Sequence, residues 1–283
     1  MLAGRLSKRY AAGPDAADAL AVAADLRSAG LLVMCEYVAH PARTPADADT
    51  AADRLADLLR GLRVTGLAGV DLLVPGGSLG WGAAGEARLR RLCEAASEAS
   101  TQVTVRPTSH TEVAGCLELV ARLRDEHPDT GVEVWASLLR TAGDLTALLA
   151  DSPPGPRVLL RTEGEGSRPA AVALPTATDV DRAFIRYARR LLGGVARPVL
   201  AADDPTLVVI AESLATRGGD GADPRPTQWL EFVMDMGRQG EEIAMLSALR
   251  RDVRIKVPFG PRWRATGLRQ LRADSPRIAR LAR

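Results

Sequence analysis

The chain has few of the residues on which metal centres and disulfide frameworks depend. Its three cysteines, Cys35, Cys93 and Cys116, lie far apart and form no CxxC pair. Its three histidines show none of the spacings that hold a metal ion. We therefore expect no metal site and no disulfides, and free cysteines of this kind are typical of a reducing compartment.

Lysine and aromatic residues are also scarce. Lys8 and Lys256 are the two lysines, so that arginine carries almost all of the positive charge, and the net charge is only +2. Aromatic residues make up 4% of the chain, and no basic run is interleaved with them. The sequence therefore does not predict a nucleic-acid-binding protein.

Long apolar runs are missing as well. The chain has no run of about 18 apolar residues, the length that a transmembrane helix needs. The first residues, MLAGRLSKRY, lack the apolar core of a signal peptide. We expect a cytoplasmic protein without a transmembrane segment.

Short apolar runs and helical patterns do alternate along the 283 residues, of which 46% are hydrophobic. The apolar runs have strand length, and the segments between them carry Ala and Leu at helical spacing. We predict strands at 31–38, 69–75, 101–105, 132–136, 157–161, 198–202, 229–234 and 253–257. We predict helices at 14–29, 51–62, 86–97, 112–124, 144–150, 178–192 and 205–215, and a charged helix between the last two strands.

This alternation favours an α/β fold of the (β/α)8 TIM-barrel type in a single domain. Continuous apolar strands are typical of a parallel sheet covered on both faces, and eight such units in under 300 residues fit a barrel. A doubly wound open sheet is the alternative, but the stretch after Val38 reads AHPARTP and has no glycine-rich fingerprint. We expect a helical segment at 1–30, the barrel at 31–275 and a tail at 276–283.

Five sequence blocks, in order along the chain, identify a family. They read VWASLLRTAGDL at 134–145, ALPTATDVDRAF at 173–184, LAADDPTL at 200–207, EFVMDMG at 231–237 and VPFGPRW at 257–263, before a short helix that carries Trp263 and Arg269. Together they resemble the flavin-dependent proline dehydrogenases. The resemblance implies a (β/α)8 barrel that binds FAD, oxidises proline or a related cyclic amino acid by hydride transfer, and passes the electrons to a quinone or another acceptor.

Several positions depart from the family pattern. The resemblance places a family lysine at Leu73, an acidic residue at Arg106, a flavin-contacting glutamine at Trp135 and a lysine at Arg161. It places a histidine at Asp203, a glutamine at Val233, tyrosines at Lys256 and Phe259, and the second arginine of an adjacent pair at Gln270. Polar contacts to flavin and substrate are thus changed at several strand ends together.

The retained and replaced residues form the candidate site. For the cofactor we expect Arg161, Arg254 and Lys256 to supply positive charge near the flavin, and Trp135 either to stack on the ring or, as we favour, to fill the space of a lost cofactor. For the substrate carboxylate we expect Arg269, with Arg272 one helical turn further on. Glu231 either orders these arginines or forms a buried ion pair across the barrel. No catalytic residue is assigned.

Three hypotheses follow. The chain is a proline dehydrogenase-like flavoenzyme, or a barrel that has lost flavin and serves as a binding or regulatory protein, or an enzyme for another substrate. The glycine-rich stretch GGSLGWG at 76–82 is interpreted as a turn rather than a phosphate site.

Overall fold

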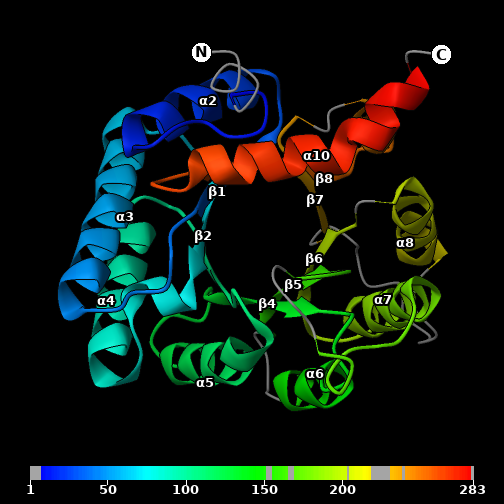
Figure 1. Ribbon diagram of the computed structural model, residues 1–283, viewed down its shortest axis with the longest axis horizontal. Coiled ribbons are helices and arrows are strands. Elements are labelled where there is room, and N and C mark those ends of the chain that lie inside the picture. The colour runs from blue at the N-terminus through cyan, green and yellow to red at the C-terminus, as the bar shows by residue number, and fades with distance from the viewer. Residues whose placement is uncertain are drawn as a thin grey trace.

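The computed structural model describes residues 8–150, 155–164, 169–202, 204–217, 230–237 and 240–281, with the backbone alone for 241–242 and 273–281. Within these ranges the chain forms a closed barrel of eight parallel strands in sequence order, with helices around it (Figure 1). The predicted TIM-type fold is therefore confirmed. None of the helices in these ranges is long and apolar enough to cross a membrane.

The strands are short and the helices follow them one by one. The strands are β1 (Leu32–Tyr37), β2 (Val70–Pro75), β3 (Val103–Arg106), β4 (Gly131–Trp135), β5 (Arg157–Arg161), β6 (Arg197–Ala201), β7 (Glu231–Asp235) and β8 (Asp252–Phe259). The helices are α2 (Ala16–Ser28), α3 (Pro45–Thr65), α4 (Gly82–Glu98), α5 (Val113–Leu123), α6 (Thr141–Leu149), α7 (Ala177–Leu192), α8 (Pro205–Arg217), α9 (Glu241–Ala248) and α10 (Trp263–Leu281). Two 3-10 turns, η1 (Gly76–Leu79) and η2 (His110–Glu112), follow β2 and β3.

The barrel closes where the last strand pairs with the first. Strand β8 runs parallel to β1 from the pair Leu32 and Arg254 to the pair Tyr37 and Phe259. This long register joins residues more than 200 positions apart in the chain. All strands therefore end at one face of the barrel, the C-terminal face, where the sites of such barrels lie.

Alternation along each strand divides its side chains between two environments. In β8, Val253, Ile255 and Val257 belong to the large apolar core beneath the helices. Arg254 and Lys256, on the other face of the same strand, are also buried and form ion pairs inside the barrel. The interior of this barrel is thus partly ionic, whereas its outer layer is an ordinary apolar core.

Helix α3 begins earlier than its apolar pattern predicts. Thr44 and Asp47 form a capping box, Pro45 takes the first helical position, and Gly66 ends the helix in the left-handed conformation with φ 64°. Cap chemistry of this kind extends a helix beyond its apolar stripe on both sides. The helix therefore covers 45–65 rather than 51–62.

The final helix is longer than the short element we predicted. Helix α10 continues to Leu281 and so includes most of the segment expected to be a tail. Among its residues 263–272, those buried are Trp263, Thr266, Gly267 and Gln270, a stripe at helical spacing. Trp263 packs against Ala11 and Val38, which fixes the start of the helix beside the end of β1.

Candidate functional site

Six charged side chains gather inside the barrel toward the C-terminal ends of its strands. They are Glu36, Arg106, Glu133, Arg161, Asp235 and Lys256, from β1, β3, β4, β5, β7 and β8 respectively, and we refer to them as the mouth cluster. All are buried apart from Arg161, whose side chain keeps 15% of its surface exposed. The set contains three carboxylates and three cations, so its charges balance.

The mouth cluster is connected by ion pairs that cross the barrel. Glu36 lies 3.0 Å from the Nε of Arg106 and 3.4 Å from the Nζ of Lys256. Lys256 lies 3.0 Å from Asp235, and Arg161 lies 4.0 Å from the same carboxylate. The pair of Glu36 and Arg106 is close without the alignment of a hydrogen bond, because neither atom satisfies hydrogen-bond geometry. Among these four pairs, that of Arg161 and Asp235 has the longest separation.

Glu133 is linked to the neighbouring indole. The Nε1–H of Trp135 donates a hydrogen bond of 2.7 Å to Oε1 of Glu133. Burial raises the pKa of Glu133, although the positive charges of Arg161 and Arg106 act in the opposite direction. A raised pKa at a barrel strand end is a property that functional carboxyl groups often show.

Trp135 is enclosed on all sides, with 1% of its surface exposed. It packs with Val113 and Leu138, and a Cβ atom on Gly164 would overlap the indole at Cδ2, Cε2 and Cε3. The loop after β5 therefore lies against the ring. No face of the indole is left for a second ring to stack on, so in this conformation Trp135 fills space and does not fit the role of a flavin-stacking residue.

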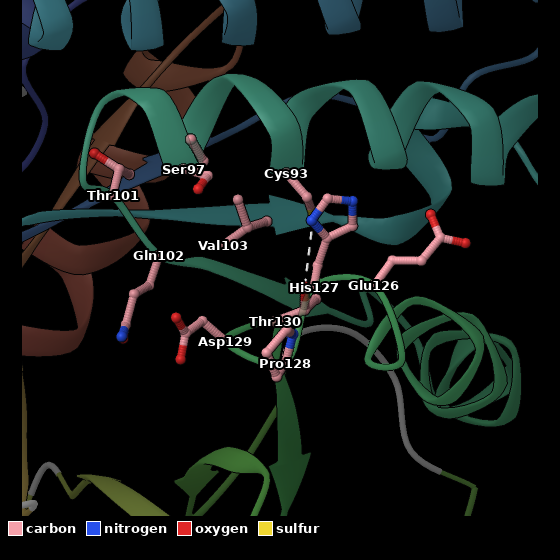
Figure 2. A pocket seen from close by; sticks show the side chains of 11 residues that line it. Cys93, Ser97, Thr101, Gln102, Val103, Glu126, His127, Pro128, Asp129 and Thr130 are labelled. Carbon is pink, nitrogen blue, oxygen red and sulfur yellow. Dashed lines mark hydrogen bonds between the residues drawn. The ribbon is translucent and has the colours of Figure 1, made fainter. Parts of the chain in front are cut away.

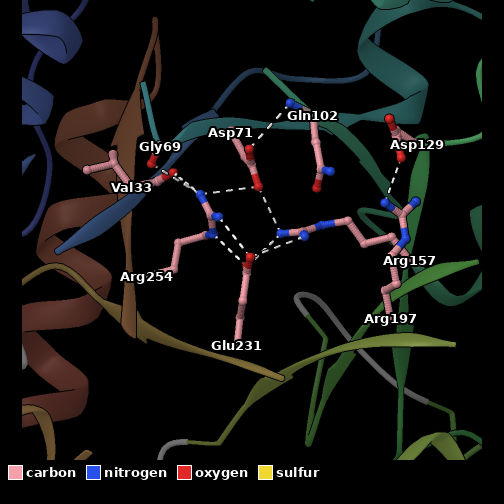
Figure 3. A network of polar contacts seen from close by, with 9 residues as sticks. All are labelled: Val33, Gly69, Asp71, Gln102, Asp129, Arg157, Arg197, Glu231 and Arg254. Carbon is pink, nitrogen blue, oxygen red and sulfur yellow. Dashed lines mark hydrogen bonds and ion pairs between the residues drawn. The ribbon is translucent and has the colours of Figure 1, made fainter. Parts of the chain in front are cut away.

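A second set of charges lies inside the barrel toward the N-terminal ends of the strands. It consists of Asp71, Arg157, Glu231 and Arg254, which we refer to as the base cluster (Figure 3). Arg254 donates to Glu231 from Nε and Nη2 at 2.8 and 3.0 Å. Arg157 donates to Asp71 and to Glu231, each at 2.8 Å. These bonds connect four strands across the centre of the barrel.

The base cluster also reaches the backbone. Nη1 of Arg254 donates to the carbonyl of Val33 at 2.6 Å, and the backbone N–H of Gln102 donates to Asp71 at 3.3 Å. Burial acts to raise the pKa of Glu231, but Arg157 and Arg254 outweigh it and lower this pKa to about 2. Burial raises the pKa of Asp71, and the two arginines offset this only in part. Glu231 is thus the more firmly ionised carboxylate of the two.

An apolar belt separates the two clusters. It consists of Met34, Leu73, Leu159, Val199, Ala201 and Val233, all buried. In β7, for example, Val233 stands between Glu231 below and Asp235 above. A layer of apolar side chains therefore lies between the two charged sets.

The predicted site residues are divided between these places. Arg161, Lys256 and Trp135 lie at the C-terminal end, as we expected for cofactor-binding residues. Glu231 begins β7 and Arg254 lies near the start of β8, so both belong to the base cluster, and the buried ion pair across the barrel is the arrangement that Glu231 adopts. This corrects our placement of Arg254 at a strand end that faces the site.

On α10, Arg269 and Arg272 are exposed, whereas Gln270 between them is 7% exposed. The Oε1 of Gln270 has no hydrogen-bond partner among the described residues. The contact of Arg269 and Arg272 with a substrate carboxylate stays a prediction. Asp203, at the position of the family histidine, lies outside the described residues.

Sequence reasoning missed Glu36, Glu133 and Asp235 as site residues, and Asp71 and Arg157 as members of the base cluster. The signal was present, because each is a charged residue within an otherwise apolar strand. Period-two alternation would have placed Glu133 and Trp135 on the same inward face of β4. Their pairing with residues of distant strands could not be read from spacing.

A cavity of about 120 Å³ lies elsewhere, among Cys93, Gln102, His127, Asp129 and Thr130 (Figure 2). It adjoins the end of α4, the start of β3 and the turn before β4. The cavity therefore lies at the N-terminal face of the barrel, which in such folds serves stability rather than chemistry. Within the described ranges, no three His, Cys, Asp or Glu side chains could hold a metal ion together.

The fold and the placement of polar groups define a (β/α)8 barrel with charged side chains in its interior, one set of them toward the C-terminal face. Proline utilization A from Bdellovibrio bacteriovorus, solved after inactivation by N-propargylglycine, is similar to it with a TM-score of 0.78 and 16% identity over 94% of this chain. Proline utilization A from Corynebacterium freiburgense is similar with a TM-score of 0.77 and 15% identity over 99% of this chain. The chain spans 32% of the length of each.

At this identity the likeness establishes the fold. The resemblance to the proline dehydrogenase family is thus confirmed for the barrel, and it extends over nearly the whole chain. No protein-family model matches the sequence, and no curated protein matches it.

Proposed function

We propose that this protein binds a small amino acid or a similar zwitterion at the mouth cluster, and that it does so without a flavin. The observation that carries the proposal is the balanced set of three carboxylates and three cations at the C-terminal face, all of them buried except Arg161, which keeps 15% of its side chain exposed. Burying six charges costs free energy unless each is paired, so an apolar interior of the same volume would serve folding at least as well. A charged interior at this face therefore indicates a site.

The geometry favours a ligand that carries both charges. Arg161 and Asp235 lie 4.0 Å apart, and both retain some exposure at 15% and 10% of their side chains. A ligand carboxylate would bind the Arg161 guanidinium, and its ammonium group would bind Asp235 and Glu133. Insertion of a zwitterion in this way exchanges one ion pair for two and keeps the cluster neutral.

The second candidate is the flavoenzyme that the resemblance implies. It would oxidise proline or a related cyclic amino acid by hydride transfer to FAD and reduce a quinone. Its support is the likeness of the fold to proline utilization A and the presence of three cations at the mouth, which could stabilise a reduced flavin. Against it stand the enclosed Trp135 and the pairing of these cations with carboxylates.

Calorimetric titration of L-proline into the purified protein tests the proposal. We expect binding of proline and no binding of pyrrolidine or cyclopentanecarboxylate, because each of these keeps only one of the two charges. Arg161→Gln and Asp235→Asn should each weaken proline binding about tenfold or more, since one charge-assisted hydrogen bond is worth roughly 1.5–3 kcal/mol. Arg60→Gln, which changes an exposed arginine of α3, is the matched control and should bind as the wild type does.

Failure of every cyclic amino acid to bind, or equal affinity for pyrrolidine and proline, would overturn the zwitterion proposal. An absorption spectrum of the same sample separates the two candidates. A flavin band that persists through purification, or that develops after incubation with FAD and gel filtration, would favour the flavoenzyme.

A cytoplasmic location and the lack of nucleic-acid binding stay predictions. The division into an N-terminal helical segment and a barrel is also a proposal, although α2 packs against β1, β8 and α3.

A further inference from the structure

Trp135 occupies a place with the properties of a ligand site. The indole lies at the end of β4, and 1% of its surface is exposed. One side of the ring is covered by the backbone of Gly164, since a Cβ atom there would overlap the six-membered ring. The apolar side chains of Val113 and Leu138 pack against it.

A specific hydrogen bond orients the ring within this place. The indole N–H donates to the buried carboxylate of Glu133 at 2.7 Å. The surroundings thus combine a flat backbone surface, an apolar wall and one acceptor at the ring edge. Binding sites for small heteroaromatic molecules are built from the same parts.

We propose that the end of β4 is a binding site for a planar heteroaromatic ring with an N–H donor, and that the chain's own Trp135 occupies it. The glycine at 164 supports the proposal, because only a residue without a Cβ atom lets the loop lie flat on the ring. The wild-type protein then admits no external ring at this end of the barrel unless Trp135 moves. The inference shares Glu133 with the proposed amino-acid site, but it rests on the surroundings of Trp135, and its test uses no amino acid, so the two proposals can fail separately.

Removal of the indole should open the site to a free ring. An apolar cavity left by deletion of a large side chain can stay dry and bind an apolar ring of matching shape. In Trp135→Ala the carboxylate of Glu133 would also lose its donor. A free indole would restore both the packing and the hydrogen bond.

The experiment is a calorimetric titration of indole and of benzofuran, an isostere that lacks the N–H, into wild type and Trp135→Ala. We expect Trp135→Ala to bind indole at least tenfold more tightly than benzofuran, and the wild type to bind neither. Trp81→Ala, which removes a tryptophan with 44% of its surface exposed, is the control and should bind neither.

Trp135→Ala could be too unstable to purify in a folded state, and refolding then provides the measurement. Refolding of the variant from urea should give a higher yield of folded protein with indole in the buffer than with benzofuran. No binding and no rescue by indole would overturn the proposal. Equal effects of indole and benzofuran would overturn it too, as would binding of indole to the wild type.

Discussion

At the scale of single residues, charged groups inside the barrel set this protein apart from an ordinary apolar core. The base cluster places two arginines and two carboxylates within hydrogen-bond distance, away from solvent. Such a set contributes little net stability compared with apolar side chains of equal volume, but the loss of one member leaves a buried charge without compensation. Glu231 accepts from both arginines and is therefore its central residue.

We expect Glu231→Gln to lower the free energy of unfolding by roughly 3–5 kcal/mol near neutral pH, because Arg157 and Arg254 then share Asp71 alone. Urea denaturation followed by circular dichroism measures this loss. Glu98→Gln is the matched control, since Glu98 pairs with Arg63 on the surface with more than half of each side chain exposed. An exposed pair of this kind contributes about 1 kcal/mol or less.

The difference in unfolding free energy between wild type and Glu231→Gln should depend on pH. The pKa of Glu231 in the folded protein is about 2, below its ordinary value of 4.5. The stability that this carboxylate contributes is therefore present above pH 4.5 and is lost as the pH falls toward 2. The difference between wild type and Glu231→Gln should shrink over this window. A difference that stays constant down to pH 2 would show that the charge of Glu231 is not responsible.

At the scale of elements, the capping residues at helix ends determine helix lengths that the apolar pattern of the sequence does not predict. Helix α3 begins at Pro45, and its N-cap residue Thr44, seven residues after the end of β1, forms a reciprocal capping box with Asp47. Hydrogen bonds to the backbone N–H groups of Arg43 and Thr44 and to the Thr44 side chain hold the pKa of Asp47 below its usual value, with the Thr44 hydroxyl as the largest contribution. The start of α3 therefore depends on two side chains.

We expect Thr44→Ala to lower the free energy of unfolding by about 1 kcal/mol, the usual contribution of an N-cap hydroxyl. Thr50→Ala, one turn into the same helix, removes the same atoms without touching the cap and should not destabilise the protein. Urea denaturation of the two variants in parallel measures both. Equal losses in the two variants would contradict a role for the capping box.

Helix α10 carries the prediction that Arg269 binds a ligand carboxylate. Arg269 lies beside the buried stripe that includes Gln270, and its side chain is exposed, so it could contact a ligand only at the rim. We therefore expect Arg269→Ala and Arg269→Lys to weaken proline binding by a similar factor of about tenfold, since lysine lacks the planar donor pair. Arg272→Ala should have a smaller effect.

The readout is the calorimetric titration of proline into the three variants and the wild type. Unchanged affinity in Arg269→Ala and Arg269→Lys would show that Arg269 is a surface arginine with no role in ligand binding. Any contribution of α10 to the site would then come from the buried Gln270.

At the scale of the whole molecule, closure of the barrel controls access to its cysteines. Cys35, Cys93 and Cys116 are free and buried. Burial raises the pKa of Cys35 to about 12 and that of Cys93 to about 11, and it raises the pKa of Cys116 as well. The thiolate form, which is the reactive one, is therefore rare in the folded protein near pH 8.

We expect a thiol reagent such as DTNB to react slowly with the native protein at pH 8 and to label all three cysteines rapidly in urea. Labelling should follow the same urea transition as circular dichroism, because the cysteines lie in β1, α4 and α5 and report on distant parts of one core. Rapid labelling of one thiol in the native protein would show that part of the barrel opens separately.

The sequence by itself determined the class of fold. Eight apolar runs of strand length, separated by helical patterns, are a local property, because each strand and helix must bury its own apolar side chains. The five family blocks, in their order along the chain, correctly placed the strands and helices of the C-terminal half, from β4 to α10. Most strand bounds agree with the structure to within two residues, and helix bounds differ where caps such as Thr44 act.

Only the tertiary structure decided which charges meet. Arg254 and Glu231 both looked like residues of one strand-end site, but closure of the barrel places them below the apolar belt and leaves Lys256 and Asp235 above it. The physical reason is that depth inside the barrel depends on the register between neighbouring strands, which long-range backbone pairing sets. The enclosure of Trp135 by Gly164 and Glu133 was decided in the same way, because it joins β4 to the loop after β5.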